Sequence, residues 1–306
     1  MDVLHCLQPL NGAKQPIAIT LGMFDGVHLG HQALLEQLKS ISQGGTPVVL
    51  TYQNHPSTTL RPQNPTKLIL PIEQRLNLLN ELGIQTTYLL NFTEEFANQT
   101  ADEFLRMLHQ QIPFSFLVLG HDARIGKNKE AGPEEIQKMA DELAFSVIQV
   151  PPYIQDGAVV SSSRLRKALQ QGYLEEVVKL LGRPYSIAGP VIGGKETGRK
   201  IGFRTANINV DSLCLPPLGV YAVWVKHQDN IYKGVVNLGF APTVKNDSSP
   251  VLEVHLLESD QNLYGEVIEV IFVKFLREEI KFETIDLLKT QIEKDIQQAI
   301  TVLKKF

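Results

Sequence analysis

The amino-acid sequence predicts two domains: an α/β Rossmann-like domain with a parallel sheet, then an antiparallel β-barrel with a terminal α-helix. The chain has 306 residues, enough for two domains of ordinary size. Short apolar runs alternate with helical periodicity in the first part, which is typical of α/β sheets. Strand-like runs separated by turn residues then follow one another, which is typical of a small barrel. We therefore place the domains at 1–182 and 183–306.

Each element of the first domain has a local signal. The apolar run 16–21 predicts a buried strand, and apolar residues at helical spacing follow the turn after it. Further strands are expected at 46–52, 86–90, 114–120 and 145–150, and helices at 71–83, around 100–111 and at 133–144. Strands that alternate with helices form a parallel sheet covered on both faces, and its ligands bind beyond the carboxyl ends of the strands.

Glycine and proline in "LGRPYSIAGPVIGG" (181–194) end the helical pattern near residue 183. Strands are expected at 185–193, 205–210, 220–227, 231–239, 251–258 and 266–276. A final amphipathic helix should cover an open face or end of the barrel. Its apolar stripe consists of Ile285, Leu288, Ile292, Ile296, Ile300 and Leu303.

Composition narrows the class of protein. Hydrophobic residues make up 43% and charged residues 20%, which describes a soluble globular chain. The formal net charge of -4 gives no footprint for non-specific nucleic-acid binding. We find no signal-peptide pattern and no apolar run of membrane-spanning length. Cys6 and Cys214 lie far apart and favour a reducing compartment. We expect a cytoplasmic protein without nucleic-acid or membrane partners, and leave a homo-oligomer open.

The stretch "GMFDGVHLGH" (22–31) joins the first buried strand to a helix. A glycine-rich turn of this kind exposes backbone N–H groups at a helix N-terminus, where phosphate commonly binds. His28 and His31 lie three residues apart on one helix face and can donate further hydrogen bonds. The alternative is a helix cap with two solvated histidines. The glycines, Asp25 and the preceding strand favour the phosphate site.

A second candidate element is "VVSSSRLRKAL" (159–169), in which three serines precede a helix. Serine commonly caps helices, so a cap alone is the alternative. Arg164 and Arg166 lie in or near the first turn, where a cation opposes the helix dipole. An anionic ligand there would remove that conflict.

These two motifs resemble the nucleotidyltransferase superfamily. Their order along the chain is similar to that of the bacterial bifunctional riboflavin kinase/FAD synthetase family, and the resemblance spans nearly the whole chain. Further segments that carry it are "YQNHP" (52–56), "GHDARIGKN" (120–128), "LLGRPYSIAGPVIGGKETGRKIGFRTANI" (180–208), "GVYAVWV", "GVVNLGFAPTV", "LEVHLL" and "LYGEVIEVIFVKFLREEIKF".

The resemblance implies that the first domain adenylylates FMN to FAD with release of pyrophosphate. The FMN phosphate is largely ionised near neutral pH, because its second pKa is about 6, so no general base is needed. His28 and His31 are then the catalytic phosphate-binding pair. The implied ATP-binding residues are Gly22, Phe24, Asp25, Gly26, His28, His31, Ser162, Ser163 and Arg164. Mg²⁺ is expected with the polyphosphate.

Asp122 matches the family's polar residue near the flavin, and a turn former beside Gly120 is the alternative. The chain has Ala123 and Ile125 where the family usually has aromatic residues. We expect weaker flavin packing at this position.

The second domain resembles riboflavin kinase, which transfers the γ-phosphoryl group of ATP to the 5′-hydroxyl of riboflavin. Glu253 matches the catalytic glutamate, and alternation puts it opposite the apolar face of its strand. A solvated glutamate is the alternative. Arg277 matches a loop residue at the flavin site, with a surface ion pair as the alternative. The implied ATP-binding residues are Gly193, Lys195, Gly198, Thr205 and Asn207.

Thr205 and Asn207 offer oxygen ligands, which suit Mg²⁺. Arg204 stands where the family usually has proline, which would fix the backbone before Thr205. We therefore expect a slower kinase or one that binds ATP more weakly.

The main interpretation is a chain that converts riboflavin to FMN and FMN to FAD, with ATP, riboflavin and FMN as its small-molecule substrates. Three alternatives stay open. One half could be inactive, or the chain could be a flavin-binding regulator without catalysis. A cytidylyl or pantetheine-phosphate nucleotidyltransferase explains the first domain and leaves the second unexplained.

Overall fold

The computed structural model describes residues 1–193, 202–240, 249–257, 259 and 261–304. It divides into two compact units, each treated separately below. The first comprises Met1–Leu68 and Arg75–Ser161, and the second comprises Ile69–Gln74 and Ser162–Phe306. The functional boundary between residues 182 and 183 stays a prediction.

The first unit is built on a six-stranded sheet in the order β1-β4-β3-β2-β5-β6. Its strands are β1 (Asp2–Leu4), β2 (Ile17–Leu21), β3 (Thr46–Tyr52), β4 (Thr86–Leu90), β5 (Phe116–Gly120) and β6 (Ser146–Val150). All neighbouring pairs are parallel, which confirms the predicted α/β class. The strand order reverses between β2 and β5, and such a switch point is where open α/β sheets bind ligands.

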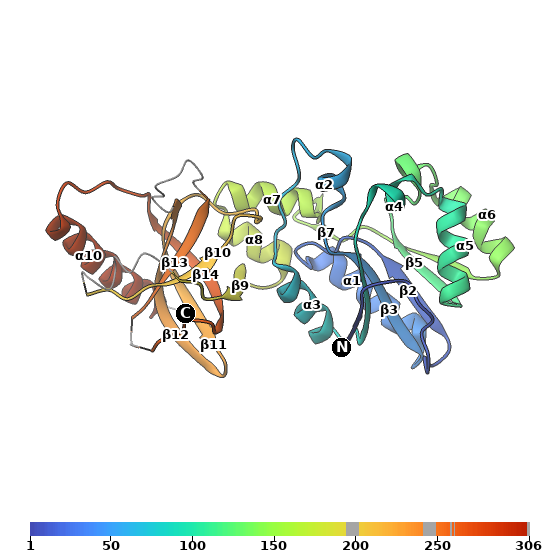
Figure 1. Cartoon of the computed structure of the whole chain (residues 1–306), viewed down its shortest axis with the longest axis horizontal. Coiled ribbons are helices and arrows are strands. Elements are labelled where there is room, and N and C mark those ends of the chain that lie inside the picture. Colours follow the sequence, from blue (N-terminus) through green and yellow to red (C-terminus); the bar gives the residue numbers. More distant parts are fainter. Residues whose placement is uncertain (194–201, 241–248, 258, 260, 305–306) are drawn as a thin grey trace. The chain divides into compact units, whose positions relative to one another are not determined.

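Helices cover both faces of this sheet (Figure 1). The helices in this part of the chain are α1 (Leu29–Ser42), α2 (Pro56–Leu60), α3 (Ile72–Glu81), α4 (Glu94–Asn98), α5 (Ala101–Gln111), 3₁₀ helix η1 (Lys127–Lys129) and α6 (Pro133–Leu143). Leu35 and Leu38 of α1 pack with Leu79 of α3 in one core. Helices α5 and α6 pack in the core on the other face. A short hairpin, β7 (Ile154–Gln155) and β8 (Ala158–Val159), follows β6.

The second unit contains an antiparallel sheet in the order β10-β13-β12-β11-β14-β9. Its strands are β9 (Ser186–Pro190), β10 (Ala206–Asn209), β11 (Gly219–His227), β12 (Asn230–Phe240), β13 (Pro250–Leu256) and β14 (Val267–Arg277). The two ends of the sheet meet, because the Ile192 N–H donates to the Asn207 carbonyl at 2.8 Å. This nearly closed barrel confirms the predicted second fold.

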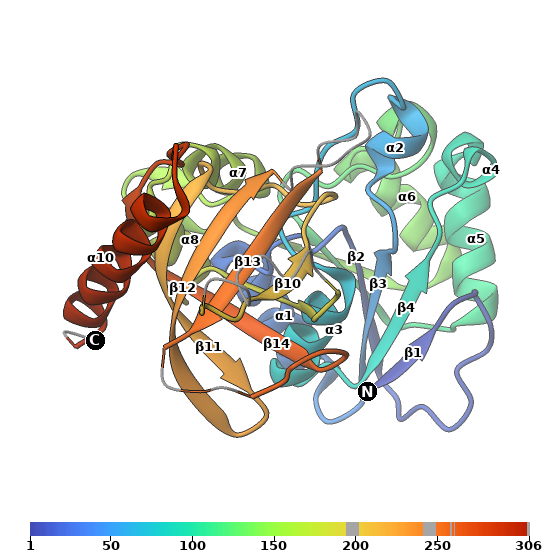
Figure 2. The same cartoon turned by 60° about the vertical axis from the view of Figure 1, so that its left-hand side comes forward.

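Among its described residues this unit also contains α7 (Ser162–Gln170), α8 (Leu174–Leu181) and α10 (Ile285–Leu303). Helix α10 packs on the outside of the barrel against β11, β12 and β14 (Figure 2). Ala299 and Leu303 are buried against Val220 and Val235. Ile285 is 61% exposed, so the predicted apolar stripe covers the barrel mainly through its C-terminal part.

Candidate active sites

The turn between β2 and α1 is tightly constrained. The Gly22 N–H donates to the Leu50 carbonyl at 3.0 Å, which ties the turn to β3. Phe24, Gly26 and Val27 have φ values of 48°, 84° and 42°. A β-branched residue such as Val27 is an outlier in this left-handed region, and such strain clusters at ligand-binding sites.

The paired histidines lie together at the start of α1. His28 is the N-cap, and its Nδ1 accepts a hydrogen bond from the His31 N–H at 3.3 Å. The two rings stack with their centroids 3.7 Å apart. Because Nδ1 of His28 is an acceptor, its neutral ring carries the proton on Nε2, which is then a donor. A Cβ on Gly30 would lie 3.2 Å from the His28 ring and 3.3 Å from the Val160 carbonyl.

Two buried charged residues, Asp25 and Arg75, interact electrostatically, and this interaction was not anticipated from the sequence. Both residues are 1% exposed. The Arg75 guanidinium donates to the carbonyls of Met23, at 2.8 Å from Nη1, and of Tyr52. Burial lowers the pKa of Arg75, and the charge of Asp25 raises it. The available signal was a cation on the apolar stripe of 71–83, four residues before Leu79.

The serine motif begins α7. Ser162, Ser163 and Arg164 form its first turn, and the motif's first residues, Val159–Ser161, belong to the first unit. Arg164 Nε donates to Glu176 of α8 at 3.1 Å. This ion pair offsets the unfavourable position of the arginine near the helix N-terminus.

The loop after β5 carries Asp122 with its side chain exposed. The Ala123 N–H donates to the Gly120 carbonyl at 3.1 Å, so Asp122 lies inside a tight turn. Ile125 is 4% exposed and belongs to the hydrophobic core, and Ala123 packs partly against that core. The backbone of Ile125 pairs with Ala131, which turns this side chain inward. Ala123 and Ile125, which stand where the family usually has aromatic residues, therefore affect how the loop packs on the core.

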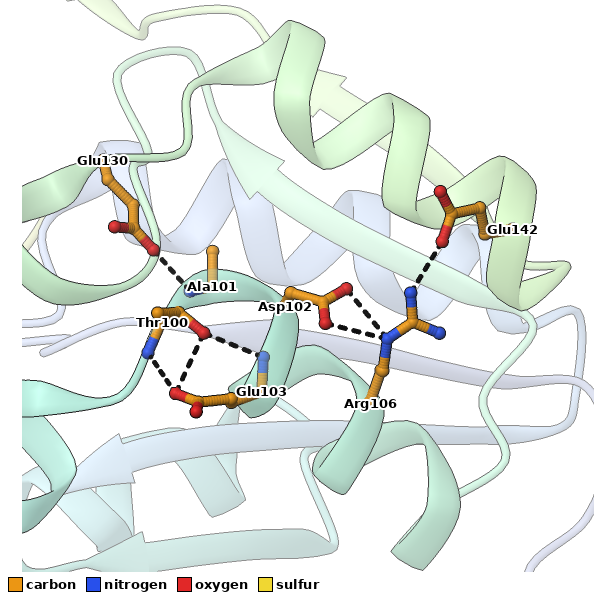
Figure 3. A network of polar contacts seen from close by, with 7 residues as sticks. All are labelled: Thr100, Ala101, Asp102, Glu103, Arg106, Glu130 and Glu142. Carbon is orange, nitrogen blue, oxygen red and sulfur yellow. Dashed lines mark hydrogen bonds and ion pairs between the residues drawn. The ribbon is translucent and has the colours of Figure 1, made fainter.

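Polar contacts hold this loop against α5 (Figure 3). Glu130 accepts from the Ala101 N–H at 2.8 Å, and the Lys127 N–H donates to the Gln99 carbonyl at 2.8 Å. A Cβ on Gly126 would lie 2.5 Å from the Ala101 nitrogen, so only glycine fits there. On the same helix, Arg106 bridges Asp102 and Glu142 at the surface.

Three polar residues lie abreast on the outer face of the barrel. Glu253 of β13 is paired with Asn207 of β10 on one side and with Asn237 of β12 on the other. Leu252 and Val254 are buried, which confirms the predicted alternation along β13. Asn237 was missed in the sequence, because its position beside Glu253 depends on strand register.

Glu279 approaches the same row from the loop after β14. It accepts a hydrogen bond from Asn237 Nδ2 at 3.2 Å. A Cβ on Gly239 would lie 1.9 Å from its Oε1, so glycine leaves room for this carboxylate. Burial raises the pKa of Glu253, and the charge of Glu279 raises it further. A raised pKa makes Glu253 a stronger base.

The predicted nucleotide segment is described in part. Gly193 follows Ile192, whose backbone pairs with Asn207, and Thr205 lies exposed just before β10. Lys195 and Gly198 lie outside the described residues. His255 Nδ1 donates to the Arg204 carbonyl at 2.8 Å. This bond restrains the backbone at Arg204.

Arg277 makes a bidentate ion pair with Asp295 of α10. Its Nη2 lies 2.6 Å from Oδ2, and its Nε lies 2.9 Å from Oδ1. Gln291 donates to the same carboxylate at 2.8 Å, and Arg277 Nη1 donates to the Glu278 carbonyl. The sequence left a surface ion pair as the alternative role of Arg277. Arg277 does form an ion pair, but Asp295 is 2% exposed, so the pair is buried.

Two general observations concern metals and membranes. In the part of the chain that the structure describes, there is no group of three or more His, Cys, Asp or Glu side chains that could hold a metal ion. Thr205 and Asn207 supply oxygen atoms, which fit a hard cation that keeps water and phosphate ligands. No helix among the described residues is both long and apolar enough to cross a membrane.

Comparisons with known proteins match both units. Residues 10–164 match the FAD synthetase family model, and residues 181–303 match the riboflavin kinase model. The chain is 38% identical to the bifunctional riboflavin kinase/FMN adenylyltransferase of Bacillus subtilis and 35% identical to that of Haemophilus influenzae. Each alignment covers 98% of both proteins.

A solved structure also matches nearly the whole chain. It is described as a macrolide-efflux protein from Streptococcus pneumoniae and aligns with a TM-score of 0.83 at 30% identity. The alignment covers 96% of this chain and 97% of that one. Both units therefore occur together, in the same order, in related proteins.

Proposed function

The chain belongs to the bifunctional riboflavin kinase/FMN adenylyltransferase family, and from this premise we propose which residues perform each reaction. It phosphorylates riboflavin to FMN and adenylylates FMN to FAD. Both families typically need a divalent metal ion with ATP. We propose that this ion is Mg²⁺, that residues 1–182 and 183–306 are the functional domains, and that the enzyme is cytoplasmic.

For adenylylation, the carrying observation is the stacked histidine pair at the N-terminus of α1, at the switch point of the sheet. ATP binds with its polyphosphate on the turn 22–27, where His28 and His31 donate to its oxygens. A phosphate oxygen of FMN attacks the α-phosphorus, the bond to the β-phosphate breaks, and pyrophosphate leaves. The histidines stabilise charge that grows on the leaving group.

Ser162, Ser163 and Arg164 contribute further contacts to ATP in this proposal. Gly30 supports this proposal. Because Gly30 has no side chain, the backbone at Val160 can approach the N-terminus of α1, where His28 and His31 lie. Asp122 contacts the flavin from the loop after β5, which is held firmly by Glu130. Rigid placement matters here, because the reaction depends on aligning two bound substrates.

For the kinase, the carrying observation is the row of Asn207, Glu253 and Asn237. Glu253 accepts the proton of the 5′-hydroxyl of riboflavin. The hydroxyl oxygen bonds to the γ-phosphorus of ATP, the bond from that phosphorus to the β-phosphate breaks, and ADP leaves. Asn207 and Thr205 would hold Mg²⁺, which neutralises phosphate charge when bound. Gly193, Lys195 and Gly198 bind the nucleotide in this proposal. Arg277 supports the flavin site by fixing the end of β14.

Single-site variants test the two assignments separately. With FMN, ATP and Mg²⁺, His31→Ala should lose FAD formation by on the order of 100-fold while riboflavin phosphorylation stays intact. With riboflavin, Glu253→Gln should lose FMN formation by about 100-fold while FAD formation from FMN stays intact. Chelation of the metal should stop both. Loss of both activities in either variant, or of neither, would reject the assignment.

Arg204 favours a second candidate, a chain with a weakened kinase half. Separation of products from riboflavin or FMN with ATP distinguishes the candidates, since a weakened kinase yields FAD from FMN but little from riboflavin. A flavin-binding regulator would bind flavin tightly and form neither product.

A further inference from the structure

Arg75 is a nearly inaccessible cation, 1% exposed, whose guanidinium contacts the turn 22–27. Its guanidinium donates to the Met23 carbonyl, one residue before Phe24, and to the Tyr52 carbonyl at the end of β3. A planar fork that reaches two carbonyls fixes both the distance and the orientation of the chains that carry them. The ends of β2 and β3 are thereby held together by one side chain.

The turn needs such support, because its backbone is strained. Positive φ values at Phe24 and Val27 persist only when surrounding contacts impose them. Thr51 Oγ1 donates to the Met23 carbonyl at 3.1 Å, which adds to the Arg75 contact at the same oxygen. Gln32 Nε2 donates to the Val27 carbonyl at 2.9 Å and secures the other end of the turn.

The charge of Arg75 has its counterpart in the turn itself. Asp25 is also buried, and its charge favours the protonated guanidinium. Burying a charge costs desolvation free energy, which an opposite charge nearby offsets. The charged forms of Asp25 and Arg75 therefore stabilise each other. Loss of the arginine would leave Asp25 buried next to the site that receives an anionic ligand.

We propose that Arg75 is a positioning residue for adenylyl transfer, which holds the turn 22–27 in the geometry that binds the ATP polyphosphate. The inference rests on the proposed placement of ATP at this turn. Arg75 acts through Met23 and Asp25 and need not touch a substrate. Its removal should affect both the KM for ATP and kcat of FAD formation, because the turn aligns the ground state and the transition state alike.

Three variants test the proposal in the full-length chain. Arg75→Met removes the charge and both donors at similar length, and kcat/KM for ATP in FAD formation should fall by on the order of 100-fold. Arg75→Lys keeps the charge without the fork and should lose less. Arg75→Ala should regain part of its activity when guanidinium is added. Riboflavin phosphorylation by the same protein should be unchanged, which reports that the second unit is folded, and rescue of Arg75→Ala by guanidinium reports that the first unit is folded.

Arg106→Met is the matched control, because Arg106 is a surface arginine of the same unit with two carboxylate partners. It should leave both reactions unchanged. Normal FAD formation in Arg75→Met, while His31→Ala has lost it, would overturn the role of Arg75 and leave the ATP site standing. Normal FAD formation in both would overturn the ATP site as well. Loss of both activities in all Arg75 variants without guanidinium rescue would make Arg75 a folding residue and also reject the proposal.

Discussion

Removal of the Asp295 carboxylate tests how α10 is attached to the barrel. In Asp295→Ala the Arg277 guanidinium loses its bidentate partner and Gln291 loses an acceptor. Breaking a buried pair costs about 3–5 kcal/mol. Arg277 keeps an 18% exposed side chain and its bond to the Glu278 carbonyl, so we expect the lower end, about 3 kcal/mol.

This loss translates into a thermal shift. For a domain of about 150 residues, 1 kcal/mol lowers Tm by about 2–4 °C, so Asp295→Ala should lower it by about 6–12 °C. Differential scanning calorimetry of the full chain measures this shift. The unfolding transition of the second unit is the one whose Tm rises when riboflavin and ADP are added. Glu293→Ala, an exposed carboxylate on the same helix, is the control and should stay within about 0.5 kcal/mol of the original.

A second comparison separates attachment of α10 from direct flavin contact. The double variant Arg277→Met/Asp295→Leu replaces the pair by apolar groups and should regain most of the lost stability. A Tm of Asp295→Ala equal to that of Glu293→Ala would refute the reasoning. If the double variant regains stability while its KM for riboflavin rises far above that of Asp295→Ala, Arg277 contacts the flavin as well.

Three further predictions follow from the site geometry. Glu279→Gln removes a negative charge that raises the pKa of Glu253, so the pKa of Glu253 should fall. The acidic limb of the pH profile of riboflavin phosphorylation should then move to lower pH. A limb that stays in place would show that the charge of Glu279 does not affect Glu253. Arg204→Pro should lower the KM of the kinase for ATP by about 2–5-fold, because proline restricts the unbound segment, and an unchanged KM and rate would reject that role. Gly126→Ala meets the Ala101 nitrogen at a positive φ and should destabilise the first unit by about 1–3 kcal/mol, measured by denaturant unfolding; unchanged stability would mean that the loop yields at no cost.

The sequence predicted the elements that carry strong local signals. The strand 46–52 matches β3, and the helix expected around 100–111 matches α5 closely. β1 has three residues and β7 and β8 have two each, too few for any periodicity, although Asp156-Gly157 between β7 and β8 is a common hairpin turn. The last helix was predicted correctly, but Ile285 is exposed, because a periodic stripe does not show how far its partner surface extends.

In the candidate sites, too, the residues with a local sequence signal were predicted and those placed by long-range contacts were not. The structure brings His28 and His31 together because both lie on one helical turn. Glu253 lies opposite the buried face because strands alternate with period two. Arg75, Asn237 and Glu279 were missed, since their contacts join segments far apart in the sequence. Strand register and buried charge pairing, which decide those contacts, leave little trace in a single sequence.

We propose that one chain holds two catalytic sites that act separately, so that FMN released from one can enter the other. Mixing Glu253→Gln with His31→Ala and supplying riboflavin, ATP and Mg²⁺ tests it most directly. Each variant alone should make almost no FAD, and the mixture should make FAD after a lag in which free FMN accumulates. A mixture that makes no more FAD than its separate components would contradict the account.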